Sequence, residues 1–271
     1  MPNDLEALAE KIKNDSISGS SETAIYVLKA LHEILSDHDT SGEQMLGFSK
    51  LLRQAKPAMA PLSNIAKIME AASYDPDPDK TALSSVERLM SNERTATDRI
   101  VEKITEKIEG TVLTLSYSGT VVNVLKAISK NKEIKVIVAE SFPLGEGRRT
   151  AEILSNDGME VTLVTDSMVF AEARSSDLCL VGADAITPQA LINKVGTYAI
   201  ALASVQAGIP VYVASSTLKV TSELKPDWII EERNNGRMSE RTQLFEPTPL
   251  ELITEVITEK GASRPGRLFR A

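Results

Sequence analysis

The sequence predicts an α/β protein in which an N-terminal helical domain, residues 1–110, is followed by a parallel-sheet domain, residues 111–271. Two observations carry this prediction. Through the first 110 residues, apolar side chains recur every three or four positions, which is the period of an amphipathic helix. From Gly110 onward, short runs rich in Val, Ile and Leu alternate with helical patterns, which favours parallel strands covered by helices on both faces.

The first domain is expected to be helical almost throughout. Helices are predicted at 21–37, 41–54, 60–72 and 82–109. The stretch "YDPDPDK" at 74–80 combines two prolines with three aspartates. It is expected to be a connector, because proline cannot continue a helix.

Five strands are expected in the second domain, with a helix after each of the first four. The strands are predicted at 111–115, 134–139, 160–165, 177–182 and 210–215, and the helices at 121–129, 149–155, 167–173 and 197–206. A last helix is predicted from Thr248, because Thr248 can cap it, Pro249 suits the first helical position and Glu251 completes a capping box. Gly261 is expected to end this helix.

Composition narrows the classes of function. The formal net charge of −8 disfavours a sequence-independent grip on nucleic acid, which needs many Lys and Arg side chains. No apolar stretch approaches the roughly 20 residues of a membrane span, and the charged N-terminus does not resemble a secretory signal, so we expect a cytoplasmic protein. With one cysteine, Cys179, and two histidines, His32 and His38, we expect no disulfide, no metal site and no cofactor.

The first candidate site follows the first predicted strand. Ligands of open parallel sheets bind beyond the carboxyl ends of the strands. There, Ser118, Gly119 and Thr120 lead directly into a helix, and the N–H groups of such a helix start can hold a phosphate. The alternative is that Ser118 simply caps the helix, which is a common arrangement. The sequence has no Walker motif and no GxGxxG pattern, so nucleotide binding of those types is not expected.

The second to fourth strands contribute weaker candidates. Glu140 could orient a ligand hydroxyl, with Arg148 or Arg149 reaching an anion, or these residues could form a solvated polar loop. Asp166 is expected to cap the helix that follows the third strand. Cys179 lies between leucines in the fourth strand and is expected to be a core residue, not a nucleophile.

The fourth and fifth strand ends combine a carboxylate with two lysines. Asp184 follows two small residues, Asn193 and Lys194 precede another helix start, and Lys219 follows the fifth strand. A carboxylate that can move protons, beside lysines that can hold phosphate, predicts a sugar-phosphate site. The alternative is a loop ion pair between Asp184 and Lys194, which would contribute little stability.

Six stretches, in this order along the chain, together resemble one family. They are "SISGSS" (16–21), "LTLSYSGTVVNVL" (113–125), "IKVIVAESFPLGEGRRTAEIL" (134–154), "LVGADAIT" (180–187), "INKVGTYAIALAS" (192–204) and "VYVASSTLKV" (211–220). The sequence is similar to the alpha, beta and delta regulatory subunits of translation initiation factor 2B, and especially to their archaeal-type alpha-like homologues. That family also includes the isomerases of ribose-1,5-bisphosphate and methylthioribose-1-phosphate.

The resemblance implies an N-terminal helical domain and a C-terminal Rossmann-like domain, usually paired as a homodimer. The ligand-binding residues that it implies are Gly19, Ser20, Ser118, Gly119, Thr120, Glu140, Asn193, Lys194 and Lys219. In the isomerases, a cysteine and an aspartate transfer protons; Asp184 stands at the aspartate position and Ser116 at the cysteine position. A hydroxyl is a far weaker acid than a thiol, so Ser116 cannot simply replace the cysteine. Ser18 and Lys56 each replace a family arginine, which also weakens the isomerase interpretation.

Three functions follow from this resemblance. The first is a regulatory protein, like the factor 2B alpha subunit, that binds a phosphorylated sugar or nucleoside monophosphate and initiation factor 2. The second is an aldose–ketose isomerase of a phosphorylated ribose that uses Asp184 and Ser116, and the third is a stand-alone metabolite sensor. In each, we expect a phosphate between residues 118–120, Lys194 and Lys219, with Asp184 facing the sugar carbons. Direct binding to nucleic acid or membrane is not expected.

Overall fold

The computed structural model describes residues 2–15, 18–37, 39–222 and 230–269. The chain divides into two compact units, Met1–Thr95 and Ala96–Ala271. The division falls within the long helix α5 (Pro78–Ile104), and the first strand of the second unit begins at Gly110. The domain boundary predicted at residue 110 stays a prediction.

The first unit is helical, as predicted. It holds α1 (Pro2–Asn14), α2 (Ser20–Asp37), α3 (Gly42–Ala55), α4 (Ala60–Ala72) and the first part of α5. Aliphatic side chains spaced along one face of each helix are buried between them, among them Leu31 and Met69. The predicted connector at 74–80 is shorter than expected, because α5 already begins at Pro78, and proline is well tolerated in the first turn of a helix.

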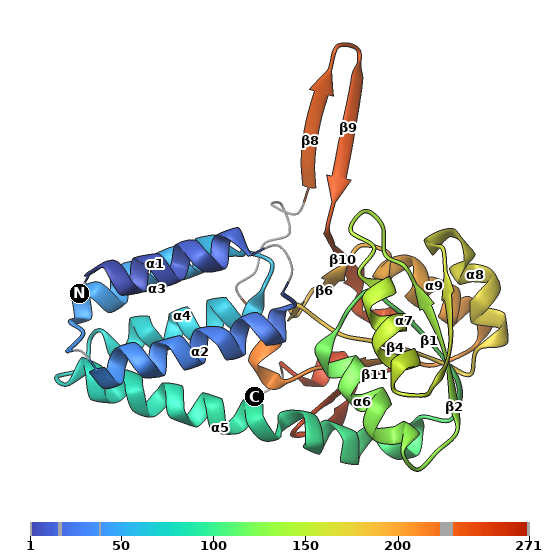
Figure 1. Cartoon of the computed structure of the whole chain (residues 1–271), viewed down its shortest axis with the longest axis horizontal. Coiled ribbons are helices and arrows are strands. Elements are labelled where there is room, and N and C mark those ends of the chain that lie inside the picture. Colours follow the sequence, from blue (N-terminus) through green and yellow to red (C-terminus); the bar gives the residue numbers. More distant parts are fainter. Residues whose placement is uncertain (1, 16–17, 38, 223–229, 270–271) are drawn as a thin grey trace. The chain divides into compact units, whose positions relative to one another are not determined.

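The second unit is built on a seven-stranded sheet in the order β12-β11-β7-β4-β1-β2-β3. Its strands are β1 (Gly110–Leu115), β2 (Ile134–Ala139), β3 (Glu160–Val164), β4 (Leu178–Val181), β7 (Val211–Ala214), β11 (Glu255–Thr258) and β12 (Gly261–Ser263). The first six of these strands pair in parallel, and β12 pairs antiparallel with β11. Figure 1 labels four of the strands, β1, β2, β4 and β11. All five predicted strands are therefore confirmed, and they are neighbours in the sheet.

Helices cover both faces of this sheet. They are α6 (Gly119–Ser129), α7 (Gly147–Asn156), α8 (Val169–Glu172) and α9 (Thr197–Ala207). Successive side chains of a strand point to opposite faces, so β4 sends Cys179 and Val181 into one core cluster and Leu178 and Leu180 into the other. The first cluster is shared with α8 and α9, and the second with α6, α7 and the end of α5.

The predicted helix after Thr248 is wrong. Residues 245–249 form β10 (Phe245–Pro249), a single 3-10 turn follows at Leu250–Leu252, and β11 and β12 complete the segment. The local capping pattern is overridden by tertiary pairing, because β11 joins the open edge of β7 and buries Val256 and Ile257. Both residues are β-branched, which favours a strand.

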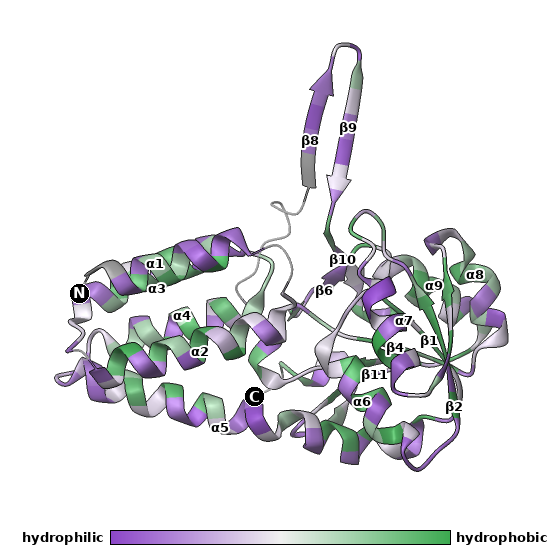
Figure 2. Cartoon of the chain, in the orientation of Figure 1, coloured by the Kyte–Doolittle hydropathy of each residue, from purple (hydrophilic) through white to green (hydrophobic). Residues whose placement is uncertain are grey.

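Five short strands were not predicted at all. A three-stranded sheet is formed by β10, β6 (Ala190–Lys194) and β5 (Ala185–Ile186), and a separate hairpin by β8 (Ile230–Asn235) and β9 (Met238–Gln243). The hairpin is largely hydrophilic, whereas the central strands are hydrophobic (Figure 2). Among the described residues, no helix has the length and apolar character needed to cross a membrane.

Candidate functional site

The start of α6 is the first predicted part of the site. Ser118 is its N-cap and accepts a hydrogen bond from the Val121 N–H at 3.4 Å, so the capping role is confirmed. Gly182, just after β4, lies against this turn: a Cβ atom there would be 2.4 Å from the Ser118 Oγ. A Cβ at Gly119 would meet only the Tyr117 hydroxyl, at 3.9 Å. The end of β4 therefore packs against the first turn of α6, while Gly119 borders open space.

Ser116, at the carboxyl end of β1, is held in an uncommon conformation. Its φ is 58°, it is buried, its carbonyl accepts from the Thr150 hydroxyl at 2.7 Å, and its N–H donates to the Ala139 carbonyl at 3.3 Å. Positive φ in a residue with a side chain costs energy and is concentrated at functional sites. These contacts fix the turn between β1 and α6 against both β2 and α7.

Asp166 is not the N-cap that was predicted. Thr165 precedes the 3-10 turn at Asp166–Met168, and the Asp166 carboxylate accepts from the N–H groups of Ser141 and Phe142 at 2.8 and 2.7 Å. The reason is tertiary: β2 and β3 are neighbours, so their carboxyl ends meet. Asp166 thus anchors the loop that carries Glu140.

The charged side chains of the β2–α7 loop and of the first turn of α7 each contact a neighbouring residue. Glu140 is half-buried and has an Arg148 guanidinium nitrogen at 3.6 Å. Arg149 stacks on Tyr117, with its guanidinium carbon 3.7 Å from the ring centroid. The prediction that one of these arginines reaches an anion stays untested.

Asp184 and Lys219 lie beside each other at the ends of β4 and β7. The Asp184 N–H donates to the Ile192 carbonyl at 2.9 Å, which ties this half-buried residue to β6. The Lys219 ammonium donates to the carbonyl of Ala183 at 2.7 Å, and Lys219 is only 3% exposed. A cation buried this deeply is normally compensated by polar partners or by a bound anion.

Lys194 pairs with a residue that sequence reasoning missed. Its ammonium lies 2.7 Å from the Glu146 Oε1, and Lys194 itself is 5% exposed. The second oxygen of Glu146, Oε2, is buried without a hydrogen-bond partner in the described part of the chain. The neighbouring Asn193 amide donates to the Thr197 hydroxyl at 3.0 Å. The signal for Glu146 was faint: a lone carboxylate between two glycines, after a predicted strand.

The start of α9 is already occupied. Glu246, from β10, accepts from the N–H groups of Gly196 and Tyr198, each at 2.8 Å, and Gly196 supports this turn with a φ of 99°. Burial raises the pKa of the Glu246 carboxyl, and these backbone bonds only partly offset the effect. An internal carboxylate therefore holds the α9 start. The predicted anion site, between residues 118–120, Lys194 and Lys219, does not include this helix start and stays a prediction.

Of the remaining predicted residues, two belong to the first unit and one lies in the core of the second. Gly19 and Ser20 form the start of α2 in the first unit, where the Gly19 N–H donates to Glu22 at 3.4 Å and Ser20 is buried. Their part in ligand binding stays a prediction. Cys179 is fully buried in β4, as expected, and burial raises the pKa of its thiol to about 12. The described residues contain no cluster of side chains suited to a metal ion.

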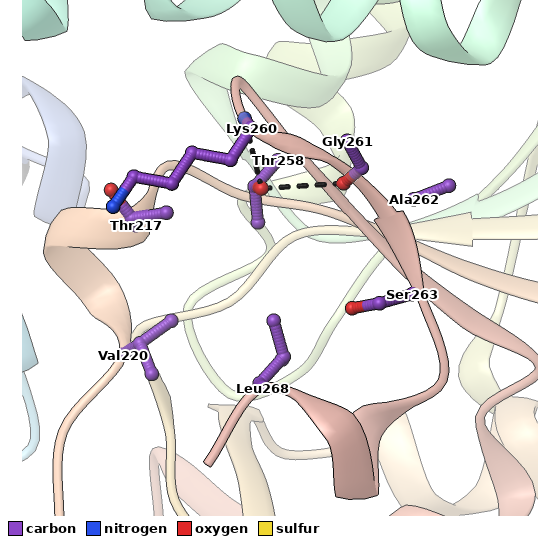
Figure 3. A pocket seen from close by; sticks show the side chains of 8 residues that line it. All are labelled: Thr217, Val220, Thr258, Lys260, Gly261, Ala262, Ser263 and Leu268. Carbon is purple, nitrogen blue, oxygen red and sulfur yellow. Dashed lines mark hydrogen bonds between the residues drawn. The ribbon is translucent and has the colours of Figure 1, made fainter. Parts of the chain in front are cut away.

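A hollow of about 350 Å³ lies near the end of β7 and the β11–β12 turn (Figure 3). Its lining residues are Thr217, Val220, Thr258, Lys260, Gly261, Ala262, Ser263 and Leu268. The Lys260 side chain extends toward Thr217 (Figure 3), and Glu259 accepts from the Thr217 N–H at 3.0 Å. Sequence reasoning did not predict this hollow.

A helical unit followed by a parallel sheet with helices on both faces defines an α/β protein of the Rossmann-like class. The chain belongs to the initiation factor 2 subunit family, whose model matches residues 16–265.

Named relatives fall into two groups. The chain is 31% identical over 97% of both chains to a translation initiation factor eIF-2B subunit 2-like protein of Pyrococcus horikoshii. It is also 30% identical to a ribose 1,5-bisphosphate isomerase of Methanocaldococcus jannaschii, over 94% of this chain and 90% of the other. Its fold matches the crystal structure of the translation initiation factor eIF-2B of P. horikoshii OT3, with a TM-score of 0.86 at 27% identity, covering 98% and 99% of the two chains.

Proposed function

We propose that this protein is a regulatory protein like the factor 2B alpha subunit, which binds a phosphorylated metabolite and a translation-factor partner in the cytoplasm. The observation that carries the proposal is that the chain has no accessible thiol to serve as the proton-donating acid of the isomerase reaction. Ser116 stands at the position of the isomerase cysteine, and the one thiol of the chain, Cys179, is enclosed in the core. Because burial raises the pKa of Cys179 to about 12, that thiol is a poor proton donor near neutral pH.

The proposed ligand is a phosphorylated sugar or a nucleoside monophosphate. Its phosphate would sit at the start of α6, near Gly119 and Thr120, because the first N–H groups of a helix have no acceptor within the helix. Two buried lysines, Lys194 at the end of β6 and Lys219 in the turn after β7, would supply positive charge. For Lys194 to bind the phosphate, the anion must compete with Glu146. Asp184 would face the sugar carbons, away from the phosphate that it would repel.

The alternative is an isomerase of ribose-1,5-bisphosphate or methylthioribose-1-phosphate, with Asp184 and Ser116 in the catalytic roles. Its support is the 30% identity to the M. jannaschii isomerase. The test is turnover of both sugar phosphates by the purified protein. We expect none above background, and turnover in the usual enzyme range, about 1–10³ s⁻¹, would overturn the regulatory proposal.

The translation-factor partner is tested separately. Purified initiation factor 2 is titrated into the protein in a sedimentation experiment, with and without the sugar phosphate. A complex is expected, and the ligand should change its affinity if binding is regulatory. Ligand binding without any complex would favour the third function, a stand-alone metabolite sensor.

A further inference from the structure

The hollow at the ends of β7 and β11 has one charged side chain in its lining, that of Lys260 (Figure 3). Lys260 is exposed, and its ammonium extends along the rim toward Thr217. The Ser263 hydroxyl, from β12, points into the hollow (Figure 3). Among the described residues, neither this ammonium nor this hydroxyl has a hydrogen-bond or ion-pair partner. Both groups are therefore available to a ligand.

The carboxylate next to Lys260 in the sequence does not neutralise it. Glu259 accepts hydrogen bonds from both the N–H and the hydroxyl of Thr217, so its charge is directed to the turn after β7. From residue 260 to residue 269 the chain carries three basic residues, Lys260, Arg264 and Arg267, and no Asp or Glu. In a chain with a net charge of −8, this local excess of positive charge favours an anion at the hollow.

The available donors suit a carboxylate better than a phosphate. Phosphates in proteins are commonly held by several free backbone N–H groups. At this rim the Thr217 N–H donates to Glu259 at 3.0 Å, and the Lys260 N–H donates to the Thr258 hydroxyl at 3.2 Å. The Lys260 ammonium and the Ser263 hydroxyl remain, and these two donors match the two oxygens of a carboxylate.

The rest of the lining is partly apolar. Val220 and Leu268 line the hollow and also pack against the core cluster of the sheet. The volume of about 350 Å³ lies at the lower end of the range for small-molecule sites, about 300–1,000 Å³. A short aliphatic chain attached to the anionic group would fill such a space.

We propose that this hollow is a second ligand site, which binds a small organic acid with a short aliphatic chain. Its carboxylate lies between the Lys260 ammonium and the Ser263 hydroxyl, and its aliphatic part contacts Val220 and Leu268. The residues that carry this site are separate from those proposed to hold the phosphate at the start of α6.

The two sites share one turn of the chain. Thr217 and Val220 line the hollow, and Lys219 lies between them in the sequence. The buried Lys219 ammonium donates to the carbonyl of Ala183, next to Asp184, at 2.7 Å. A ligand that shifts this turn also shifts Lys219, so the organic acid should change the affinity for a sugar phosphate. This coupling rests on the proposed function, whereas binding in the hollow does not.

The test is a titration of the intact protein with isovalerate, followed by NMR of the ligand, with the neutral isovaleramide as the chemical control. Isovalerate should bind, and the amide should bind about tenfold more weakly, because it lacks the charge that Lys260 recognises. Lys260→Ala should weaken isovalerate binding by a similar factor, Lys260→Arg should retain it, and Ser263→Ala should weaken it less. The matched control is Lys135→Ala, which removes an exposed lysine near the start of β2 and should leave the affinity unchanged.

Several results would overturn the site. They are no binding of isovalerate, equal binding of the amide, or an unchanged affinity of Lys260→Ala. Inorganic phosphate that displaces isovalerate at equal concentration would overturn the preference for a carboxylate. None of these results depends on sugar-phosphate binding, so they are distinct from a failure of the proposed function. Calorimetry with ribose-1,5-bisphosphate, with and without saturating isovalerate, tests the shared turn. We expect its affinity to change by about fivefold or more, and an unchanged affinity would overturn the coupling.

Discussion

Helices α6 and α9 both begin at the carboxyl edge of the sheet, but their first turns are satisfied in different ways. The α6 start is capped by the neutral Ser118 side chain and borders open space at Gly119. The α9 start holds the Glu246 carboxylate, which accepts from two of its N–H groups. Both starts carry the same positive end of a helix dipole. What differs is the internal anion, so of these two helix starts we expect an external phosphate at α6.

The largest effect on phosphate binding, its complete loss, is expected from Gly182→Ala, which places a new side chain against the α6 start. The new Cβ would lie 2.4 Å from the Ser118 Oγ and 2.8 Å from its Cβ, so the first turn of α6 must shift. We expect a loss of about 1–3 kcal/mol in the free energy of unfolding, measured by urea denaturation, with loss of phosphate binding. The control is Gly47→Ala in α3, where nothing lies within 4 Å and a small gain in stability is expected. An unchanged Gly182→Ala protein would mean that the close approach is not needed.

Lys194→Ala should weaken ribose-phosphate binding by about 1.5–3 kcal/mol, the range for a hydrogen bond to a charged group. Isothermal titration calorimetry measures this directly. The control is Lys135→Ala, because Lys135 is an exposed lysine on β2 that pairs with Glu160. Equal affinities of the wild type and Lys194→Ala would place the phosphate away from Lys194.

Glu146→Gln should have the opposite effect on the affinity for the sugar phosphate, measured by the same calorimetric titration. In the structure, the Glu146 carboxylate holds the Lys194 ammonium at 2.7 Å, where an arriving phosphate must compete with it. The amide keeps the shape but removes the negative charge. Tighter binding of the sugar phosphate is therefore expected, and weaker binding would show that Glu146 contacts the ligand favourably.

Ser118→Ala removes a helix cap and should cost about 1 kcal/mol of unfolding free energy. Ser41→Ala is the matched control, since Ser41 caps α3 in the first unit through a capping box. Both variants should lose similar stability in urea denaturation, but only Ser118→Ala should also weaken phosphate binding. Equal phosphate affinities of the two variants would mean that Ser118 caps the helix but does not contribute to phosphate binding.

The smallest effect is expected from Glu246→Gln, and its sign depends on pH. Because burial raises the pKa of the Glu246 carboxyl, the folded state holds this proton more tightly than the unfolded state. The stability that this tighter proton binding gives the folded state is complete below the ordinary pKa of 4.5. It is lost as the pH rises through the raised pKa of the folded state. The Gln variant should therefore gain stability relative to the wild type between acidic and neutral pH in denaturation experiments. A relative loss over that range would mean that the helix dipole outweighs burial.

The central sheet was predictable from the sequence because its strands are continuous apolar runs. The runs at 111–115 and 134–139 became β1 and β2, buried on both faces. The segment after Thr248 failed because its capping signal is local, whereas the open edge of β7 that receives β11 is distant in sequence. Strand β6 was missed for a similar reason, since its partner β10 is distant in sequence: Lys194 pairs with Phe245 and Ala190 with Pro249.

The candidate site shows the same limit. Ser118, Asp184 and Lys219 could be proposed because each follows a recognisable strand, and parallel topology brings strand ends to one edge. The residues that pair with the polar groups at this edge could not be predicted from strand positions. Glu146 meets Lys194 across 48 positions, and Glu246 meets Tyr198 across the same number. No local pattern links either pair, so the choice between an open and an occupied helix start needed the structure.

The central claim is that an external phosphate binds at the start of α6 and not at the start of α9. A crystal structure with bound ribose-1,5-bisphosphate tests it most directly. We predict one phosphate within hydrogen-bond distance of the Gly119 and Thr120 N–H groups, with the Lys194 ammonium turned from Glu146 toward the ligand and Asp184 facing the sugar. A phosphate at the Gly196 turn in place of Glu246, or in the hollow beside Lys260, would contradict the account.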